Sequence, residues 1–207
     1  TGKTGAYLLP ILNRIIHAKE RHTNTLILAP TRELAQQIDQ HIEGLGYFVS
    51  VSSMPVYGGG DGFTWDQQKR SLAEGADIIK ATPGRLIAMI SSYDVNFTHL
   101  QYLVLDEADR MLDMGFAPQL ESIRRTLRGH RQTLMFSASF NPFVEKMAEG
   151  FFLQTPYMIR AETAEKPVAQ LKQKLLFLER KDKNDRLIFE LKSIKQSAII
   201  FTADQES

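Results

Sequence analysis

Two adjacent carboxylates follow one of the most apolar runs of this 207-residue chain. Asp106 and Glu107 come directly after residues 102–105, Tyr-Leu-Val-Leu. If that run is a buried parallel strand, the pair lies at its carboxyl end, where open α/β sheets bind ligands. One carboxylate there can hold a hydrated Mg²⁺ ion, and its neighbour can orient an attacking water. The alternative is that Asp106, Glu107 and Asp109 only favour the start of a helix through its dipole.

A second candidate for the same chemistry lies at residues 1–4, Thr-Gly-Lys-Thr, which match the end of the phosphate-binding loop G-x-x-x-x-G-K-[ST]. Gly2 lets the backbone approach a phosphate, Lys3 can reach the β and γ phosphates, and the Thr4 hydroxyl can bind a metal. A bare G-K-[ST] also arises by chance. Combined with a strand-terminal acidic pair, it predicts a site for a Mg²⁺-bound nucleotide.

The elements that must position these residues alternate between short apolar runs and stretches of helical period, which is typical of βαβ units. The runs are apolar nearly throughout, as in parallel strands buried on both faces. We therefore expect an α/β fold with a mostly parallel sheet and helices on both faces. The expected strands are 25–29, 49–56, 77–81, 102–105 and 133–136, and the expected helices are 32–45, 65–74, 85–91, 118–127 and 142–152, after a first helix that begins near residue 2 and contains Pro10.

Composition limits the possible partners and compartments. The chain is 43% hydrophobic and 24% charged with a net charge of +1, so any basic surface for a polyanion has to be local. The absence of cysteine excludes disulfides and thiolate metal sites. We expect a cytoplasmic protein, with the nucleus as the open alternative. No window approaches the roughly 18 apolar residues of a membrane span.

Five further motifs follow one another along the chain: Pro-Thr-Arg-Glu-Leu-Ala at 30–35, Gly-Gly at 58–59, Thr-Pro-Gly-Arg-Leu at 82–86, Asp-Glu-Ala-Asp at 106–109, and Ser-Ala-Ser at 137–139. With these motifs in this order, the chain resembles the DEAD-box RNA helicases over almost its whole length. Between the second and third motifs, Gln68, Leu72 and Gly75 also follow the family pattern, whereas the last motif is Ser-Ala-Thr in the family. The resemblance implies a RecA-like P-loop NTPase domain.

The resemblance implies roles at a nucleotide site. By similarity, Gly2, Lys3 and Thr4 hold ATP, Asp106 joins Thr4 in binding Mg²⁺, largely through water, and Glu107 positions the hydrolytic water. Lys3, Asp106 and Glu107 are thus the expected catalytic residues. In the family the Ser-Ala-Ser segment links the state of ATP to work on RNA; the alternative is a polar loop after a strand. The expected coupling residues are Asp109, Ser137, Ala138 and Ser139.

The resemblance also implies an RNA-binding surface. Hydroxyl and guanidinium groups can donate to phosphate oxygens, and glycines expose backbone N–H groups, so we expect binding that is independent of sequence and sensitive to salt. The alternative is structural, with strand ends, helix caps and a turn, and both roles can coexist. The residues concerned are Pro30, Thr31, Arg32, Gly58, Gly59, Thr82, Pro83, Gly84 and Arg85.

Three features need a separate explanation. Ser139 keeps the hydroxyl of the family's threonine but lacks its methyl group. Lys80 stands inside an expected strand, where the family usually has an aliphatic residue, so its ammonium must reach the strand end or find an acidic partner. Trp65 could stack on a base, but its helical spacing favours a place in the core.

The expected domains are a first RecA-like ATP-binding domain over residues 1–160, truncated at its start, a linker over 161–170, and the start of a second RecA-like domain over 171–207. The second should contain a strand at 171–178, a helix at 183–195 and a strand at 197–202. One βαβ unit of that size rarely buries enough surface to be stable alone. Residues 199–203, Ile-Ile-Phe-Thr-Ala, resemble the opening motif of the family's second domain.

The function expected for the complete protein is therefore ATP-dependent RNA unwinding or remodelling of RNA–protein complexes, by a monomer that uses ATP and Mg²⁺. The chain alone should bind ATP poorly and unwind nothing, because the family's second domain supplies arginines to the nucleotide. Two alternatives stay open: an ATP-gated RNA clamp with little turnover, and a different P-loop ATPase such as a DNA translocase.

Overall fold

The computed structural model describes residues 2–18, 22–58, 65–70, 75–93, 95–160, 174–194 and 197–201. Thr1, Gly59, Leu72 and the expected linker at 161–170 lie outside these ranges. The chain forms two compact units that divide between Tyr157 and Met158. No helix among the described residues is long and apolar enough to cross a membrane.

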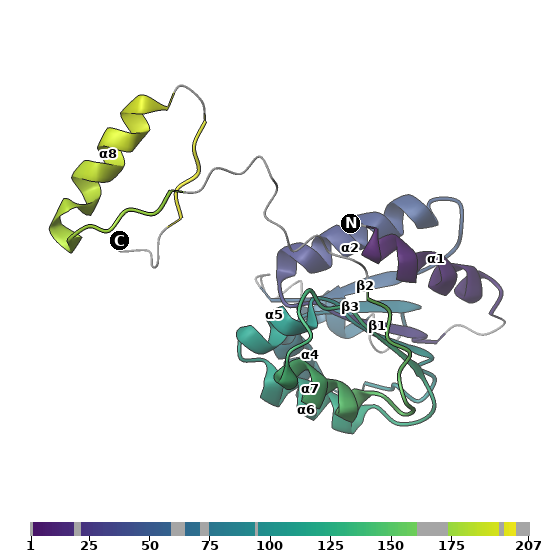
Figure 1. The fold of residues 1–207 in the computed structure, drawn as a ribbon. Helices are drawn as coiled ribbons and strands as arrows, with labels where there is room; N and C mark the ends of the chain where they lie inside the picture. The colour runs from purple at the N-terminus through teal and green to yellow at the C-terminus, as the bar shows by residue number, and fades with distance from the viewer. Residues whose placement is uncertain are drawn as a thin grey trace. The chain divides into compact units, whose positions relative to one another are not determined.

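The larger unit is built on a five-stranded sheet in the order β2-β3-β1-β4-β5 (Figure 1). Every neighbouring pair of strands is parallel. The chain leaves β1 toward β2 on one side and leaves β4 toward β5 on the other, so the order switches direction between β1 and β4, the place where such sheets bind ligands. The strands are β1 Thr25–Leu28, β2 Ser53–Val56, β3 Ile78–Ala81, β4 Tyr102–Leu105 and β5 Gln132–Met135.

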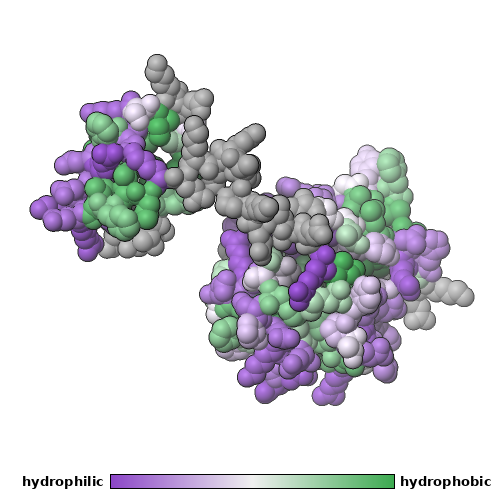
Figure 2. Space-filling model, in the orientation of Figure 1, coloured by the Kyte–Doolittle hydropathy of each residue, from purple (hydrophilic) through white to green (hydrophobic). Residues whose placement is uncertain are grey.

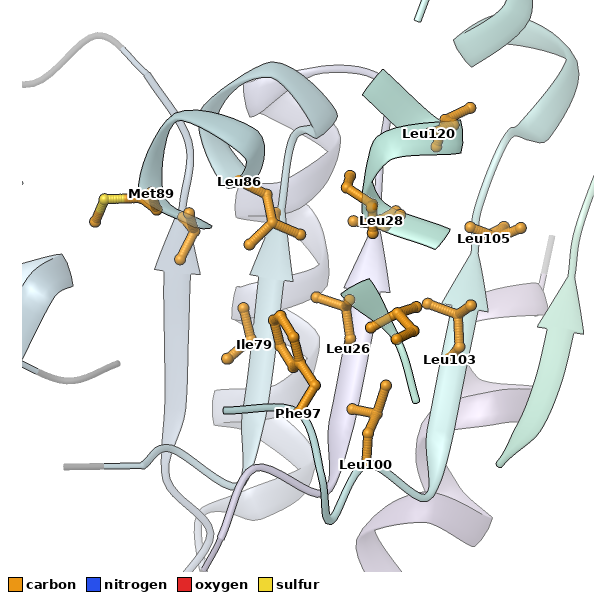
Figure 3. Packing of buried hydrophobic residues seen from close by; sticks show 14 of the residues in the cluster. Leu26, Leu28, Ile79, Leu86, Met89, Phe97, Leu100, Leu103, Leu105 and Leu120 are labelled. Atoms are coloured by element: carbon orange, nitrogen blue, oxygen red, sulfur yellow. The ribbon is translucent and has the colours of Figure 1, made fainter. Parts of the chain in front are cut away.

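Helices cover both faces of this sheet, which confirms the expected α/β class. Because strand residues point alternately to opposite faces, Ile27 packs with α1 (Lys3–Ile16) and α2 (Arg32–Gly46). Leu26 and Leu28 pack on the other face, in the cluster drawn in Figure 3. That cluster draws on α4 (Pro83–Ser92), α6 (Ala117–Thr126) and α7 (Pro142–Phe151). A short helix, α5 (Ala108–Asp113), follows β4, and residues 65–70 are also helical.

Most expected elements of the larger unit are present within two residues at each end. Strand β2 is the clear difference, because only the second half of the expected 49–56 strand forms. The amide of Val49 bonds to Gly46 O, and Ser52 is held by Asp77, so the first half makes a turn. Helix α1 continues past Pro10, which is exposed on the side away from the sheet. The described part of the expected 65–74 helix is residues 65–70.

The smaller unit contains a 3₁₀ turn, Arg180–Asp182, followed by α8 (Lys183–Ser193), and the expected helix is thereby present. The two expected strands are not: residues 174–178 and 197–201, the described parts of them, have no strand assignment. Phe177 and Phe201 are each 90% exposed. Figure 2 shows apolar side chains on the surface of this unit. A strand needs a neighbour for its backbone groups, and the described residues of this unit offer none.

Candidate functional site

The N-terminal end of α1 is the candidate phosphate-binding site. Gly2 has a φ of 72°, a left-handed conformation that glycine adopts without the steric cost of a Cβ atom. The helix begins at the next residue and has no acidic side chain in its first turn. Its unpaired N–H groups and positive dipole end can therefore receive an anion, next to the exposed Lys3 and the half-buried Thr4.

Asp106 leaves β4 as a buried carboxylate at the switch point of the sheet. Its amide donates to Leu28 O over 2.9 Å, and only 5% of the residue is exposed. Burial raises the pKa of Asp106; hydrogen bonds from Tyr7 and from the Glu107 amide, together with the charge of Lys3, act in the opposite direction. A carboxylate that is costly to ionise without a nearby cation is suited to a metal site.

Tyr7 connects the two halves of this site. Its hydroxyl donates to Oδ2 of Asp106 over 3.1 Å, while Oδ1 accepts from the Glu107 amide over 3.0 Å. The Tyr7 ring packs against Phe136, which follows β5, with 5.3 Å between ring centroids. Burial and the charge of Asp106 raise the pKa of Tyr7, so its hydroxyl remains a donor. The first turn of α1 thus fixes the orientation of the Asp106 carboxylate.

Glu107 has an unusual backbone. With φ 50° and ψ 54° it is the one residue other than glycine with a positive φ in the part of the chain that the structure describes. This conformation turns the chain sharply from β4 into α5. The side chain is 40% exposed, and Oε2 accepts from Nη1 of Arg110 over 3.2 Å. Glu107 therefore reaches solvent beside the buried Asp106, where a carboxylate can bind a water molecule.

Asp109 joins the acidic segment to the segment after β5. Its Oδ2 accepts from the amide and the hydroxyl of Ser139, over 2.8 and 3.0 Å. Ser137 accepts from the Asp109 amide over 3.2 Å and donates to Ser139 O over 2.6 Å. Partial burial raises the pKa of Asp109, but these hydrogen bonds outweigh it and the net pKa is lowered. Ala138 lies between the two serines and is exposed.

The residues expected to contact RNA come directly after β1, β3 and β2, at the carboxyl ends of these parallel strands. Thr31 is half-buried and caps α2, because its hydroxyl accepts a hydrogen bond from the Leu34 amide over 3.3 Å. Thr82 precedes α4 without a side-chain cap bond, so its hydroxyl is available to another partner. The structural alternative is thus present for Thr31, whereas the expected turn at Pro83 and Gly84 is wrong, because these two residues begin α4. Pro30 and Pro83 are buried, whereas Arg32, Gly58 and Gly84 are exposed.

Arg85 projects from the first turn of α4 against the helix at residues 65–70. Its Nε donates to Gln68 Oε1 over 3.2 Å, and its guanidinium lies 4.0 Å from the centroid of the Trp65 ring. Burial lowers the pKa of Arg85 from its usual value. Trp65 itself is partly buried and packs against the core cluster, as expected.

Lys80 is fully buried and finds an acidic partner, Asp39 on α2. Its ammonium also donates to Ser53 Oγ over 3.1 Å, and Ser53 donates to Asp39 over 3.2 Å. The sequence showed that Lys80 needed such a partner but gave no indication which acid it was. Tyr7 was missed entirely; its position one helical turn after Thr4, on the apolar face of the first helix, was the available signal.

Several known proteins are similar to this chain over most of its length. The DEAD/DEAH box helicase family model matches residues 1–147. The human ATP-dependent RNA helicase DDX42 is 41% identical over 169 residues, which cover 80% of this chain and 18% of that protein. The ATP-dependent RNA helicase DBP2 of Scheffersomyces stipitis is 39% identical over 214 residues, covering 98% and 39%.

A solved structure gives the same result for the fold. The yeast DEAD-box splicing factor Prp28 superposes with a TM-score of 0.66 at 36% identity, over 72% of this chain and 37% of that one. The chain thus spans well under half the length of these relatives. Its larger unit has the expected RecA-like fold, and the chain belongs to the DEAD/DEAH box helicase family.

Proposed function

We propose that this chain supplies the ATP-binding part of an RNA helicase whose RNA-stimulated ATP hydrolysis drives local unwinding of RNA duplexes or remodelling of RNA–protein complexes. One observation carries the proposal. Asp106 and Glu107 follow β4, Thr31 follows β1, and Thr82 and Arg85 follow β3, and β1 pairs in parallel with both β3 and β4. Thr4 lies in α1, one turn before Tyr7, whose hydroxyl bonds to Asp106. A nucleotide and an RNA backbone can therefore be held by the same rigid sheet.

The nucleotide half of the site fits ATP and Mg²⁺. Lys3 and the N–H groups at the start of α1 bind phosphate oxygens. Thr4 and Asp106 offer the hard oxygen ligands that Mg²⁺ prefers, and each Asp106 oxygen accepts only one hydrogen bond from the described residues. When bound, the ion neutralises charge that develops on the phosphates. Glu107 orients the attacking water once its carboxylate leaves Arg110.

The RNA half of the site binds the sugar–phosphate backbone. Thr82 and Arg85 donate to phosphate oxygens, so binding does not depend on base sequence. Asp109 and Ser139 follow β4 and β5, beside Glu107, and their hydrogen bonds can rearrange when the phosphates change, which is the basis for their proposed coupling role. We place the protein in the cytoplasm as a monomer, with residues 171–207 beginning a second RecA-like domain.

The experiment that tests this proposal measures phosphate release from ATP by the full-length protein, with and without RNA. We expect turnover that RNA stimulates and DNA does not, reduced about 100-fold or more by Glu107→Gln. Arg110→Gln is the matched control, because it frees Glu107 but leaves the carboxylate in place. Turnover that survives Glu107→Gln would contradict the assignment of the water-positioning residue.

Absence of turnover has its own meaning. If the full-length protein stays on RNA in the presence of ATP without hydrolysing it, the protein is an ATP-gated clamp, and the Glu107–Arg110 pair is the observation that favours this alternative. A translocase on DNA would show equal stimulation by DNA. The isolated 207-residue chain should separate no duplex in any of these cases, because it spans so little of its relatives.

A further inference from the structure

A compact cluster of aromatic, amide and cationic side chains surrounds Arg85. Trp65 and Gln68 come from the helix at residues 65–70, Arg85 comes from α4, and Tyr93 directly follows α4. The indole Nε1 of Trp65 donates to the Tyr93 hydroxyl over 2.8 Å, and the two rings lie 5.9 Å apart. Trp65 is therefore held by its edge, with one ring face against the Arg85 guanidinium at 4.0 Å.

Gln68 fixes the guanidinium along a second direction. It is 4% exposed, and its amide spans two segments: Oε1 accepts from Arg85 Nε over 3.2 Å, and Nε2 donates to Tyr57 O over 3.4 Å. Tyr57 immediately precedes Gly58, an expected RNA contact. With its plane against Trp65 and its Nε on Gln68, the guanidinium has little rotational freedom left.

The remaining donors of Arg85 are free to bind a ligand. Within the described residues, its two Nη groups make no hydrogen bond and its charge has no carboxylate partner. A guanidinium presents these groups as a planar fork that matches two phosphate oxygens. Holding the fork in place before binding avoids the entropy that a free arginine would lose.

We propose that Trp65 and Gln68 are positioning residues that orient Arg85 toward a phosphate of the bound RNA strand. The inference rests on the proposed function, because it takes RNA as the ligand of this edge. It adds that the helix at residues 65–70, which touches no phosphate through these two side chains, sets the affinity for RNA through Arg85. The groups that orient the guanidinium are the ring face of Trp65 and the side-chain amide of Gln68.

The test is a titration of fluorescein-labelled oligouridylate into the full-length protein with ATP present, followed by anisotropy at several salt concentrations. Arg85→Gln should weaken binding about 10-fold and lower the slope of log affinity against log salt by about 0.7, the loss of one phosphate contact on a single strand. Trp65→Leu removes no charge, yet it should weaken binding roughly 5-fold and lower the slope in the same direction.

Three further variants separate positioning from packing. Trp65→Phe keeps an aromatic face and should bind nearly as the parent does. Gln68→Met keeps the volume but loses both hydrogen bonds, and it should resemble Trp65→Leu. In the double variant of Arg85→Gln with Trp65→Leu, the two losses should not add, because both act on one guanidinium. Lys69→Gln, in the same helix, is the control for a lost charge, since Lys69 lies over Tyr93 and not over Arg85.

The outcomes distinguish this inference from the proposed function. If Trp65→Leu leaves affinity and salt slope unchanged, or lowers affinity with an unchanged slope and additively with Arg85→Gln, Trp65 only packs and the inference is wrong. If the protein binds no RNA, or binds it equally well after Arg85→Gln, the proposed RNA site itself is wrong. Melting temperatures of all variants show whether a loss follows from unfolding, and recovery in Trp65→Phe excludes that explanation.

Discussion

Two four-residue runs in this chain, both apolar throughout, have different surroundings. Residues 102–105, Tyr-Leu-Val-Leu, form β4 in the sheet of the larger unit and are at most 7% exposed. Residues 175–178, Leu-Leu-Phe-Leu, lie in the smaller unit without strand assignment and are between 40% and 90% exposed. The difference teaches that such a run becomes a strand only where other strands complete its backbone hydrogen bonds and helices cover its faces.

Amide hydrogen exchange should show the largest contrast between the two runs. Amides of β4 are expected to exchange only when the larger unit unfolds, and those of residues 175–178 to exchange almost as in an unfolded chain, a difference of at least about 1000-fold. Mass spectrometry of peptides from both runs measures it, with α8 as an internal reference for an isolated helix. Equal protection of the two runs would show that residues 175–178 do pair with another strand.

Truncating one leucine in each run should give the next largest difference. Leu103 is fully buried in the cluster of Figure 3, so Leu103→Ala should lower the free energy of unfolding by about 3 kcal/mol. Leu176→Ala, at a position that is 40% exposed, should change it by less than about 0.5 kcal/mol. Urea unfolding followed by far-UV circular dichroism compares them, and similar losses would remove the distinction.

The two units also differ in how they hold a lysine. Lys80 has no exposed surface and depends on Asp39, so at pH 6 Asp39→Leu should lower the free energy of unfolding by about 2 kcal/mol. Adding Lys80→Met should restore most of that loss. The pair of Lys174 with Glu190 in the smaller unit is solvent-exposed, and Glu190→Gln should have no measurable effect. An equal effect at both pairs would mean that Lys80 reaches water.

The pH dependence of stability tests the same lysine. Burial lowers the pKa of Lys80 to about 7 from 10.5. Between these two values the unfolded chain keeps a proton that the folded chain has released, so the free energy of unfolding should rise with pH over this window. The difference between the parent chain and Lys80→Met, measured by urea unfolding from pH 6 to 10, isolates this contribution. A constant difference across that range would contradict the lowered pKa.

Helix caps should give the smallest contrast. Asn141 caps α7 by accepting from the amides of Phe143 and Val144, each over 3.0 Å, so Asn141→Ala should cost about 1 kcal/mol. Asp182 stands at the same position before α8 but makes no side-chain cap bond, and Asp182→Ala should change the helix content little. Thermal melting monitored at 222 nm compares the two variants; a larger loss from Asp182→Ala would show that α8 depends on a cap.

The sequence predicted the larger unit well because its strands are read from local composition. Continuous apolar runs such as 102–105 indicated buried parallel strands, and polar residues directly after them indicated the edge where Asp106 and Thr82 lie. Contacts between distant segments could not be predicted in this way. Asp39 and Lys80 are 41 residues apart, and the bond from Tyr7 to Asp106 spans 99. The prediction of two strands in the smaller unit was wrong for the same reason. A strand needs a partner strand, and local sequence does not reveal whether one is present.

The backbone of Glu107 has a consequence for how this protein can change over evolution. A left-handed backbone conformation costs a residue with a Cβ atom roughly 1 kcal/mol or more of conformational free energy, and glycine has no such steric cost. Random mutation followed by selection for thermal resistance should therefore recover Glu107→Gly as a gain, at the position where we propose that a carboxylate orients the attacking water. A lineage that kept folding but lost its selection for catalysis would be expected to lose this glutamate early.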